Sequence, residues 1–327
     1  MIVAFIIPTG IGCAIGGHAG DATPAAKMIA SLCDKIILHP NVVNASDINE
    51  MPSNALYVEG SMLDRFLEGS FGLQEVRSNR VLVAVSPDAQ PETINAVNAA
   101  KATIGMDAEI VVLDTPLIMR GYVRQGVACG TSEGVDDLIA QVEEYDFDAL
   151  AVASPIDVSP EESLKYFRGK QSVNPWGGIE AAVSRHISAA FNKPVAHAPI
   201  ESRSTKNNPE LFGILYNEVV HPRKAAEICS NCYIHCILKG LHRAPRIGNE
   251  IARGHVNALI TPAGCIGRAH LACFGAGIPV IAVEENTTAY NFRDSRIVYV
   301  KNYLEAAGYL SCLKAGVTPL SVRSDNE

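Results

Sequence analysis

The sequence has little positive charge, no long apolar run and only one tryptophan. Its 27 Lys and Arg residues stand against 35 Asp and Glu residues, so the formal net charge is −8. Proteins that bind nucleic acid or an anionic membrane surface generally carry excess positive charge, so both classes are disfavoured. No run approaches the ~18 apolar residues of a membrane-spanning helix. We therefore expect no nucleic-acid partner, no membrane partner and a cytoplasmic protein.

The beginning of the chain also lacks the features of a secretion signal. The apolar segment "MIVAFIIPTGIG" has no positively charged residues before it and is interrupted by Pro8, so it is predicted to be a buried strand. The nine cysteines are an odd number in a chain without such a signal, which argues against a disulfide framework. Buried thiols, a metal site or a reactive cysteine remain as interpretations.

Short runs of Val, Ile, Ala and Leu recur along the chain, and each ends at a proline. These prolines are Pro8, Pro87, Pro116, Pro155, Pro199 and Pro262. Continuous apolar runs are typical of strands covered on both faces. Helical patterns over residues 90–105 and 132–146 lie between them. The sequence therefore predicts an α/β fold with largely parallel sheets, built from repeated strand–Pro/Gly loop–helix units.

The division of this fold along the chain is weakly marked. With 48% hydrophobic residues, the chain is able to bury a large core. We place an N-terminal α/β lobe at residues 1–150 and a C-terminal α/β lobe at residues 151–327, with a soft boundary that also admits one unit. Because no low-complexity linker separates them, the two lobes should pack tightly around a cleft.

One phrase occurs twice and, more loosely, a third time. Residues 174–201 and 261–285 each contain Pro-x-Gly, an alanine-rich helical stretch, an apolar strand and a Glu, and residues 8–40 follow a similar plan. Pro-x-Gly is common in simple turns, but three copies at one sheet edge favour a ligand site, because open α/β sheets bind ligands at the carboxyl ends of their strands. The binding candidates from these loops are Gly10, Gly12, His18, Gly177, Gly178 and Gly264.

The first glycine loop is a poor match to a dinucleotide-binding loop. It has GxGxxxG spacing from Gly10 to Gly16, but the next apolar run is followed by His39 where an acidic residue for the ribose is expected. A cradle for a phosphate or carboxylate suits the loop better.

Candidate acid–base groups stand at the ends of apolar runs and in the loops that follow. A carboxyl group at a buried strand end has its pKa raised by desolvation, which suits proton transfer near neutral pH. Cys265 precedes a predicted helix, where the helix dipole favours a thiolate, and His270 follows it. The catalytic candidates are Glu284, Glu285, Cys265, His270, His197 and Glu201.

Arginines near these segments are candidates for holding an anion. A guanidinium group binds carboxylate or phosphate through two parallel hydrogen bonds. We expect Arg185, Arg223 and Arg243 to serve in this way, with Asn286 beside the paired glutamates. The alternative is that they are ordinary surface residues.

Cys229, Cys232 and Cys236 have C-x2-C-x3-C spacing, which is compatible with an iron–sulfur cluster or zinc. The same spacing places the three thiols along a predicted helix among Ile and Leu residues, where cysteine acts as a small buried apolar residue. We favour core packing and predict no cofactor or metal, and the metal site remains the alternative.

Four segments carry a resemblance to a known family. They are "IIPTGIG", "NPWGGIEAAVSRHIS", "HPRKAAEICSNCYIHCILKGLHRAP" and "PAGCIGRAHLACFGAGIPVIAVEEN". Together they resemble an uncharacterised family of cyanobacteria, other bacteria and plastids, labelled only as a domain of unknown function. The resemblance implies one full-length unit in the cytosol or the plastid stroma. It supplies no activity, cofactor or catalytic residue.

The residues themselves favour an enzyme that acts on a small anionic metabolite, a carboxylate or phosphate, in a cleft between the lobes. Acid–base or thiol chemistry would make it a lyase, isomerase or hydrolase. The alternatives are an iron–sulfur or zinc protein and a non-catalytic metabolite-binding protein. We also expect a homo-oligomer.

Overall fold

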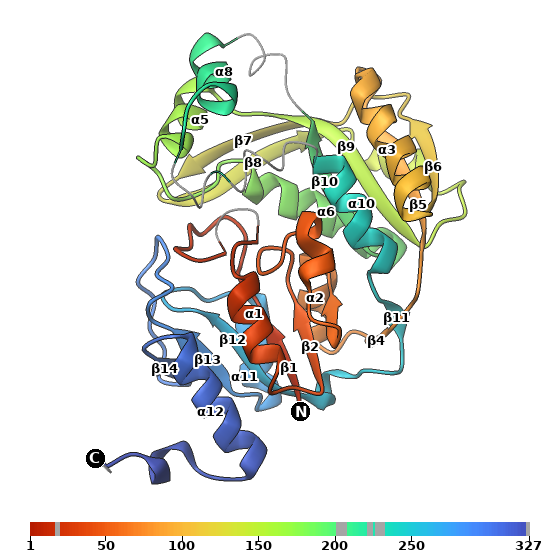
Figure 1. The fold of residues 1–327 in the computed structure, drawn as a ribbon. Coiled ribbons are helices and arrows are strands. Elements are labelled where there is room, and N and C mark those ends of the chain that lie inside the picture. The colour runs from red at the N-terminus through yellow and green to blue at the C-terminus, as the bar shows by residue number, and fades with distance from the viewer. Residues whose placement is uncertain (17–19, 201–207, 221–224, 226–232, 325–327) are drawn as a thin grey trace.

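The computed structural model describes residues 1–16, 20–200, 208–220, 225 and 233–324. The strands form two large sheets, one above the other in Figure 1, with helices packed on and between them. We call these the first sheet, which contains the N-terminal strand, and the second sheet.

The first sheet combines strands from both ends of the chain. It has six parallel strands in the order β14-β13-β12-β1-β2-β3. Their bounds are β1 Ile2–Phe5, β2 Lys35–Leu38, β3 Ala55–Tyr57, β12 Val256–Pro262, β13 Val280–Val283 and β14 Ile297–Val300. Chain order runs outward in both directions from the β1–β12 pair. Loops on either side of this point diverge, which leaves space for a ligand at the carboxyl ends of the strands.

Alternation along the buried strands gives the first sheet two apolar faces. Val3 and Phe5 point to one face, which is covered by α1 (Thr23–Ala30) and α12 (Tyr303–Ala315). Ala4 and Ile6 point to the other, which is covered by α2 (Gly60–Leu67) and α11 (Arg268–Ala276). Because both faces are covered, the strands are apolar at successive positions.

The second sheet lies within residues 80–200. Its order is β6-β5-β9-β7-β8, with β10 also paired to β9, and only the β7–β8 hairpin is antiparallel. One face is covered by α3 and α10, and the other by α4 and α6. The bounds are β5 Arg80–Val85, α3 Pro91–Ile104, β6 Asp107–Val112, β7 Ile118–Arg124, β8 Val127–Glu133, α4 Val135–Val142, β9 Ala149–Asp157, α6 Gly177–Phe191, β10 Val195–Ile200 and α10 Tyr233–Arg243.

Smaller elements complete the chain. Strands β4 and β11 pair as a short antiparallel ribbon beside the chain crossings between the two sheets. The remaining bounds are η1 Ala45–Glu50, β4 Gly72–Gln74, α5 Pro160–Phe167, α8 Pro209–Tyr216, β11 Arg246–Gly248, η2 Arg253–His255 and η3 Pro319–Val322. Within the described ranges, no helix combines the length and apolar character needed to cross a membrane.

The predicted α/β class with mostly parallel sheets is confirmed, and the apolar runs that end at prolines form or enter strands of both sheets. The sheets do not divide the chain at residue 150. That position lies inside β9, which has neighbours in the same sheet on both sides, and β1–β3 share their sheet with β12–β14. Apolar runs identify strands, but their order along the chain does not reveal which strands pair.

Candidate functional site

A cavity of about 400 Å³ lies between the two sheets, at the carboxyl ends of the first sheet's strands. The segments after β1, β2 and β3 form one side of it, together with the first turn of α11. Residues of α6, β10 and α10 from the second sheet form the other side. The cavity therefore occupies the place where parallel α/β sheets bind ligands.

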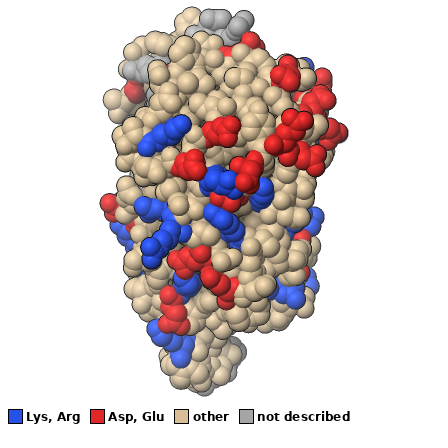
Figure 2. All heavy atoms as spheres, turned by 90° about the vertical axis from the view of Figure 1, so that its right-hand side faces the viewer, with Lys and Arg blue, Asp and Glu red and all other residues tan. Residues whose placement is uncertain are grey.

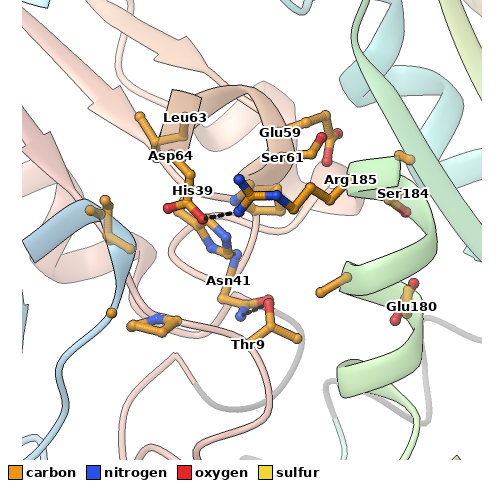
Figure 3. A pocket seen from close by; sticks show the side chains of 18 of the residues that line it. Thr9, His39, Asn41, Glu59, Ser61, Leu63, Asp64, Glu180, Ser184 and Arg185 are labelled. Carbon is orange, nitrogen blue, oxygen red and sulfur yellow. Dashed lines mark hydrogen bonds and ion pairs between the residues drawn. The ribbon is translucent and has the colours of Figure 1, made fainter. Parts of the chain in front are cut away.

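Helix α6 contributes polar side chains to this cavity because it is amphipathic. Ile179, Val183 and Ile187 pack against the second sheet. Glu180, Ser184 and Arg185 line the cavity, and Figure 3 shows them on α6 opposite the segment that begins α2. Helices α2 and α6 also pack against each other, so the two sides of the cavity are fixed by direct contact.

Glu59 is the most unusual ionisable group of the site. It is the N-cap residue of α2, two residues after the end of β3, and only 7% of it is exposed. Burial, together with the negative charge of Glu180, raises the pKa of Glu59 to about 8, although a hydrogen bond with Tyr57 acts in the opposite direction. Desolvation disfavours the charged carboxylate, so Glu59 holds its proton at neutral pH.

Unpartnered polar atoms cluster around the same cavity. Within the described part of the chain, five buried side-chain polar atoms lack a hydrogen-bond partner. Three of them belong to cavity residues: Oε1 of Glu59, Oγ of Ser61 and Nδ1 of His197. Because most buried polar groups in native proteins are hydrogen-bonded, such a cluster points to a functional site.

His197 on β10 lies between the cavity and the second sheet. Its Nε2 is 2.8 Å from Oγ of Ser154 on β9, and its Nδ1 is 3.8 Å from Oε1 of Glu180. The side chain of His197 is fully buried, whereas that of Glu180 is 29% exposed. A buried imidazole thus adjoins a carboxylate that solvent reaches.

Arg185 places a cation in the cavity. Its guanidinium group lies 3.5 Å from Asp64 of α2, and Figure 3 shows these two side chains facing each other. Burial raises the pKa of Asp64, while the charge of Arg185 opposes that change. Among the described residues this is the one polar contact of the Arg185 guanidinium group, and its other N–H groups can bind a carboxylate or phosphate.

Two further imidazoles on the cavity wall are neutral. Burial lowers the pKa of both His39 and His270 to about 4. The Asn41 backbone N–H donates to Nδ1 of His39, and the Gly267 backbone N–H donates to Nδ1 of His270. In each neutral ring the proton is therefore on Nε2, and that of His270 faces the Thr261 hydroxyl at 3.0 Å.

Cys265 does not have the properties of a nucleophile. It is buried beside His270, with its Sγ 3.9 Å from Nε2 of His270, and burial raises the pKa of its thiol to about 11. The thiol donates to the carbonyl of Pro262 at 3.4 Å. A thiolate is the reactive form, so this environment opposes thiol chemistry.

The first two glycine loops meet beside the cavity. A Cβ added at Gly177 would lie 2.7 Å from Thr9 and 3.6 Å from the backbone nitrogen of Gly10, and one at Gly178 would lie 2.2 Å from the carbonyl of Ala128. The glycines therefore allow the α6 start to approach the β1 loop and β8. Gly12 also allows close packing, since a Cβ added there would lie 2.6 Å from Oγ of Ser172. These residues position the loops and do not line the cavity.

The segment that follows residues 261–285 approaches the first glycine loop through backbone hydrogen bonds. The Ala14 N–H donates to Thr287 O and the Ala289 N–H donates to Ile11 O. Gly264 itself has φ +86° and packs against the Tyr290 carbonyl, so it is a turn residue. Of residues 261–285, only the start of α11 reaches the cavity.

The paired glutamates predicted as catalytic lie elsewhere. They follow β13, and Oε1 of Glu284 accepts a hydrogen bond from Arg293 at 2.9 Å, whereas Oε1 of Glu285 accepts one from the Tyr303 N–H at the start of α12. Asn286 is fully buried and bonds both the Ile15 backbone and Tyr303. These contacts are structural, and none of the three residues lines the cavity.

The other candidates are divided between the surface and the part of the chain not described. Arg243 is exposed at the end of α10, and Cys236 is half-buried on the same helix. His18, Glu201, Arg223, Cys229 and Cys232 lie outside the described residues. The alternative of a metal site on the three cysteines thus stays a prediction. Within the described ranges, no group of three or more Asp, Glu, His or Cys residues is arranged to hold a metal ion.

Sequence reasoning missed Glu59, Ser61 and Asp64. All three follow a strand of only three residues, and no proline marks its end. The available signal was the segment "ALYVEGS", an apolar run followed by a carboxylate and a helix start. The same pattern, an apolar run followed by a carboxylate, predicts Glu284.

The fold and the cavity together define an α/β protein with a candidate ligand site at the carboxyl ends of a parallel sheet. The chain belongs to the family described as "Protein of unknown function (DUF3326)", which it matches over residues 2–323. This confirms the resemblance derived from the four segments.

The chain is also similar to a cyanobacterial protein. The chain is 34% identical over 339 aligned positions to an "uncharacterized lipoprotein" of Synechococcus sp., with 97% of this chain and 92% of the relative covered. No solved structure matches the chain.

Proposed function

We propose that this protein is an enzyme that transfers protons on a small metabolite bound between the two sheets. Glu59 is the general acid, Glu180 is the general base, and Arg185 holds an anionic group of the substrate. The reaction is a lyase, isomerase or hydrolase reaction, since these classes proceed by proton transfer without a redox cofactor.

The observation that carries this proposal is the pair of unequal carboxyl groups at one cavity. Burial and the charge of Glu180 raise the pKa of Glu59 to about 8, and both residues line the same space. Two carboxyl groups whose environments separate their protonation states are the usual basis of acid–base assignment. The unpartnered Oε1 of Glu59 is a further reason to place the acid there.

Carboxyl chemistry is favoured over thiol chemistry at this site. The raised pKa of the Cys265 thiol keeps it protonated, and Glu284 and Glu285 are occupied by structural contacts. An anionic substrate group is consistent with Arg185, whose partner Asp64 is 3.5 Å away and occupies one side of the guanidinium group.

The test is a substrate screen followed by matched variants. The protein is incubated with a fractionated metabolite extract, and consumed compounds are identified by mass spectrometry. Glu59→Gln and Glu180→Gln should each lower turnover of the identified compound by about 10²- to 10⁴-fold, the usual contribution of general acid–base catalysis. Glu109→Gln is the control, because Glu109 is exposed on β6.

Two other results would replace this proposal. Suppose that Glu59→Gln and Glu180→Gln keep full turnover and the double variant Glu284→Gln/Glu285→Gln loses it. The catalytic residues would then be Glu284 and Glu285, as predicted from the sequence. A compound that binds tightly and is never converted by the wild type would favour the non-catalytic alternative. We propose that the reaction takes place in the cytoplasm, or in the plastid stroma if the protein comes from a plastid-bearing organism.

A further inference from the structure

Ser154 and His197 form a buried pair between the second sheet and the cavity. Ser154 on β9 and the His197 side chain on β10 are both fully buried, and their polar atoms are 2.8 Å apart. Neighbouring parallel strands fix this geometry, because Ala153 pairs with Ala198 and Val152 with His197 in the β9–β10 register. Neither side chain is therefore free to change its partner easily.

The Ser154 hydroxyl has one hydrogen and, among the described residues, two neighbouring atoms that can accept it. One is Nε2 of His197 at 2.8 Å, and the other is the Met119 thioether at 3.6 Å. A thioether sulfur is a weak acceptor, whereas an unprotonated imidazole nitrogen is a strong one. The hydroxyl hydrogen should therefore go to Nε2, which must then be the unprotonated nitrogen.

This assignment also determines whether the other ring nitrogen of His197, Nδ1, carries a hydrogen. A neutral imidazole with an unprotonated Nε2 carries its hydrogen on Nδ1. That nitrogen lacks a hydrogen-bond partner among the described residues, and it lies 3.8 Å from Oε1 of Glu180. The Nδ1–H group thus faces a carboxylate across a gap slightly longer than a hydrogen bond. Catalytic hydrogen bonds are often long in the absence of substrate and shorten when it binds.

We infer that Ser154 is a positioning residue that fixes His197 as the Nδ1–H tautomer, so that His197 orients the Glu180 carboxylate. The role of Ser154 in catalysis rests on the proposed function, whereas the tautomer of His197 can be tested without it. Ser154 acts through His197 and is not a nucleophile, because it is fully buried and is not part of the cavity wall. The chain of contacts runs from Ser154 on β9 through His197 on β10 to Glu180 on α6.

The test is long-range ¹H–¹⁵N NMR of the full-length protein labelled with ¹⁵N in its histidine rings. His197 is assigned by the signals lost in His197→Gln. The wild type should show His197 with hydrogen on Nδ1 and an unprotonated Nε2. Finding the hydrogen on Nε2 in the wild type would overturn the inference without any variant.

A pair of serine variants tests the cause. Ser154→Ala should abolish the pure Nδ1–H pattern, and Ser154→Thr, which keeps the hydroxyl, should restore it. Ser163→Ala is the matched control, since Ser163 is also buried and its hydroxyl lacks a partner among the described residues. That variant should leave the His197 signals unchanged. An unchanged pattern in Ser154→Ala would contradict the assigned role.

Glu180→Gln separates this inference from the proposed function. If Nδ1–H faces Glu180, removing the charge should shift the Nδ1–H proton resonance of His197 and leave the tautomer unchanged. A resonance that does not move would overturn the orienting role. If turnover proves independent of Glu59 and Glu180 while the tautomer is as inferred, the proposed function fails and the Ser154 assignment stands.

Discussion

Glu59 combines a buried position, an unpartnered oxygen and a raised pKa. Glu59 occupies the N-cap position of α2 on the cavity wall, where burial raises its pKa and the charge of Glu180 further disfavours a second carboxylate. A surface carboxyl group would lose its proton near pH 4.5. This single group therefore couples the stability of the protein to pH in a range where most carboxyl groups have already ionised.

The first prediction at this scale concerns that coupling. The folded-state pKa of Glu59, about 8, is above the ordinary value of 4.5, so its stabilising contribution is complete below pH 4.5 and is lost as the pH rises through 8. The cost is at most about 1.4 kcal/mol per pH unit within that window. Glu59→Gln cannot ionise and should lack this loss. Urea unfolding of both proteins between pH 5 and 9 measures the difference.

The expected result is a gap that grows in favour of Glu59→Gln as the pH increases, with the two proteins closest at pH 5. Glu109→Gln serves as the control and should follow the wild type at each pH, because Glu109 is exposed. A constant difference between Glu59→Gln and the wild type across the range would mean that Glu59 ionises normally.

Three of the candidate residues predicted from the sequence line the cavity, and each stands on an element that the repeated Pro-x-Gly pattern marks. His197 and Arg185 lie in the second Pro-x-Gly copy, and His270 follows the third, and all three line the cavity. Glu284 also follows a strand as predicted, but its carboxylate accepts a hydrogen bond from Arg293 and does not line the cavity. Burial of Glu59 depends on α6 and β10, over a hundred residues away, so no local pattern reveals it.

At the scale of elements, the start of α6 determines how closely the two halves of the site approach. Its first residues are Gly177 and Gly178, which contact the β1 loop and β8 with no room for side chains. The glycine of the Pro-x-Gly motif thus permits the start of α6 to pack closely against the β1 loop and β8. The sequence predicted that the copies would meet, but it assigned the glycines to ligand binding.

The second prediction tests this packing. Gly178→Ala places a Cβ 2.2 Å from the backbone oxygen of Ala128, and a backbone atom cannot move aside cheaply. We expect a loss of about 1–3 kcal/mol in the free energy of unfolding, as for other overpacked positions. The measurement is chemical denaturation at constant pH.

Gly275→Ala is the matched control for that variant. Gly275 lies inside α11, and an added Cβ would have nothing within 4 Å. Replacing a helix-interior glycine by alanine should be neutral or stabilise by up to about 1 kcal/mol. Equal effects at both positions would show that contact with β8 does not matter.

At the scale of the whole molecule, the candidate site belongs to neither sheet alone. The first sheet supplies the strand ends and Glu59, and the second supplies Glu180, Arg185 and His197. The fold class was predictable because buried parallel strands have a local signature. The pairing of β1 with β12, more than 250 residues apart, has no such signature, so the lobes placed at residues 1–150 and 151–327 do not match the sheets.

The surface charge also differs from that of the cavity. On the face shown in Figure 2, acidic side chains gather on the upper part, and basic side chains in the middle lie among acidic ones. The described cavity residues, by contrast, bring together carboxyl groups, imidazoles and Arg185, and Glu59, His39, His197 and His270 among them are buried. Unusual protonation is therefore expected in the cavity and not on that face.

Glu59 keeps its proton at neutral pH because the packed elements of both sheets bury it and the negative charge of Glu180 disfavours a second carboxylate. The most direct measurement is a pH titration of the glutamate side-chain carboxyl carbons by ¹³C NMR, with Glu59 assigned by the signal missing from Glu59→Gln. We predict a midpoint near pH 8 in the wild type and a lower midpoint in Glu180→Gln. A wild-type midpoint near 4.5 would contradict the account.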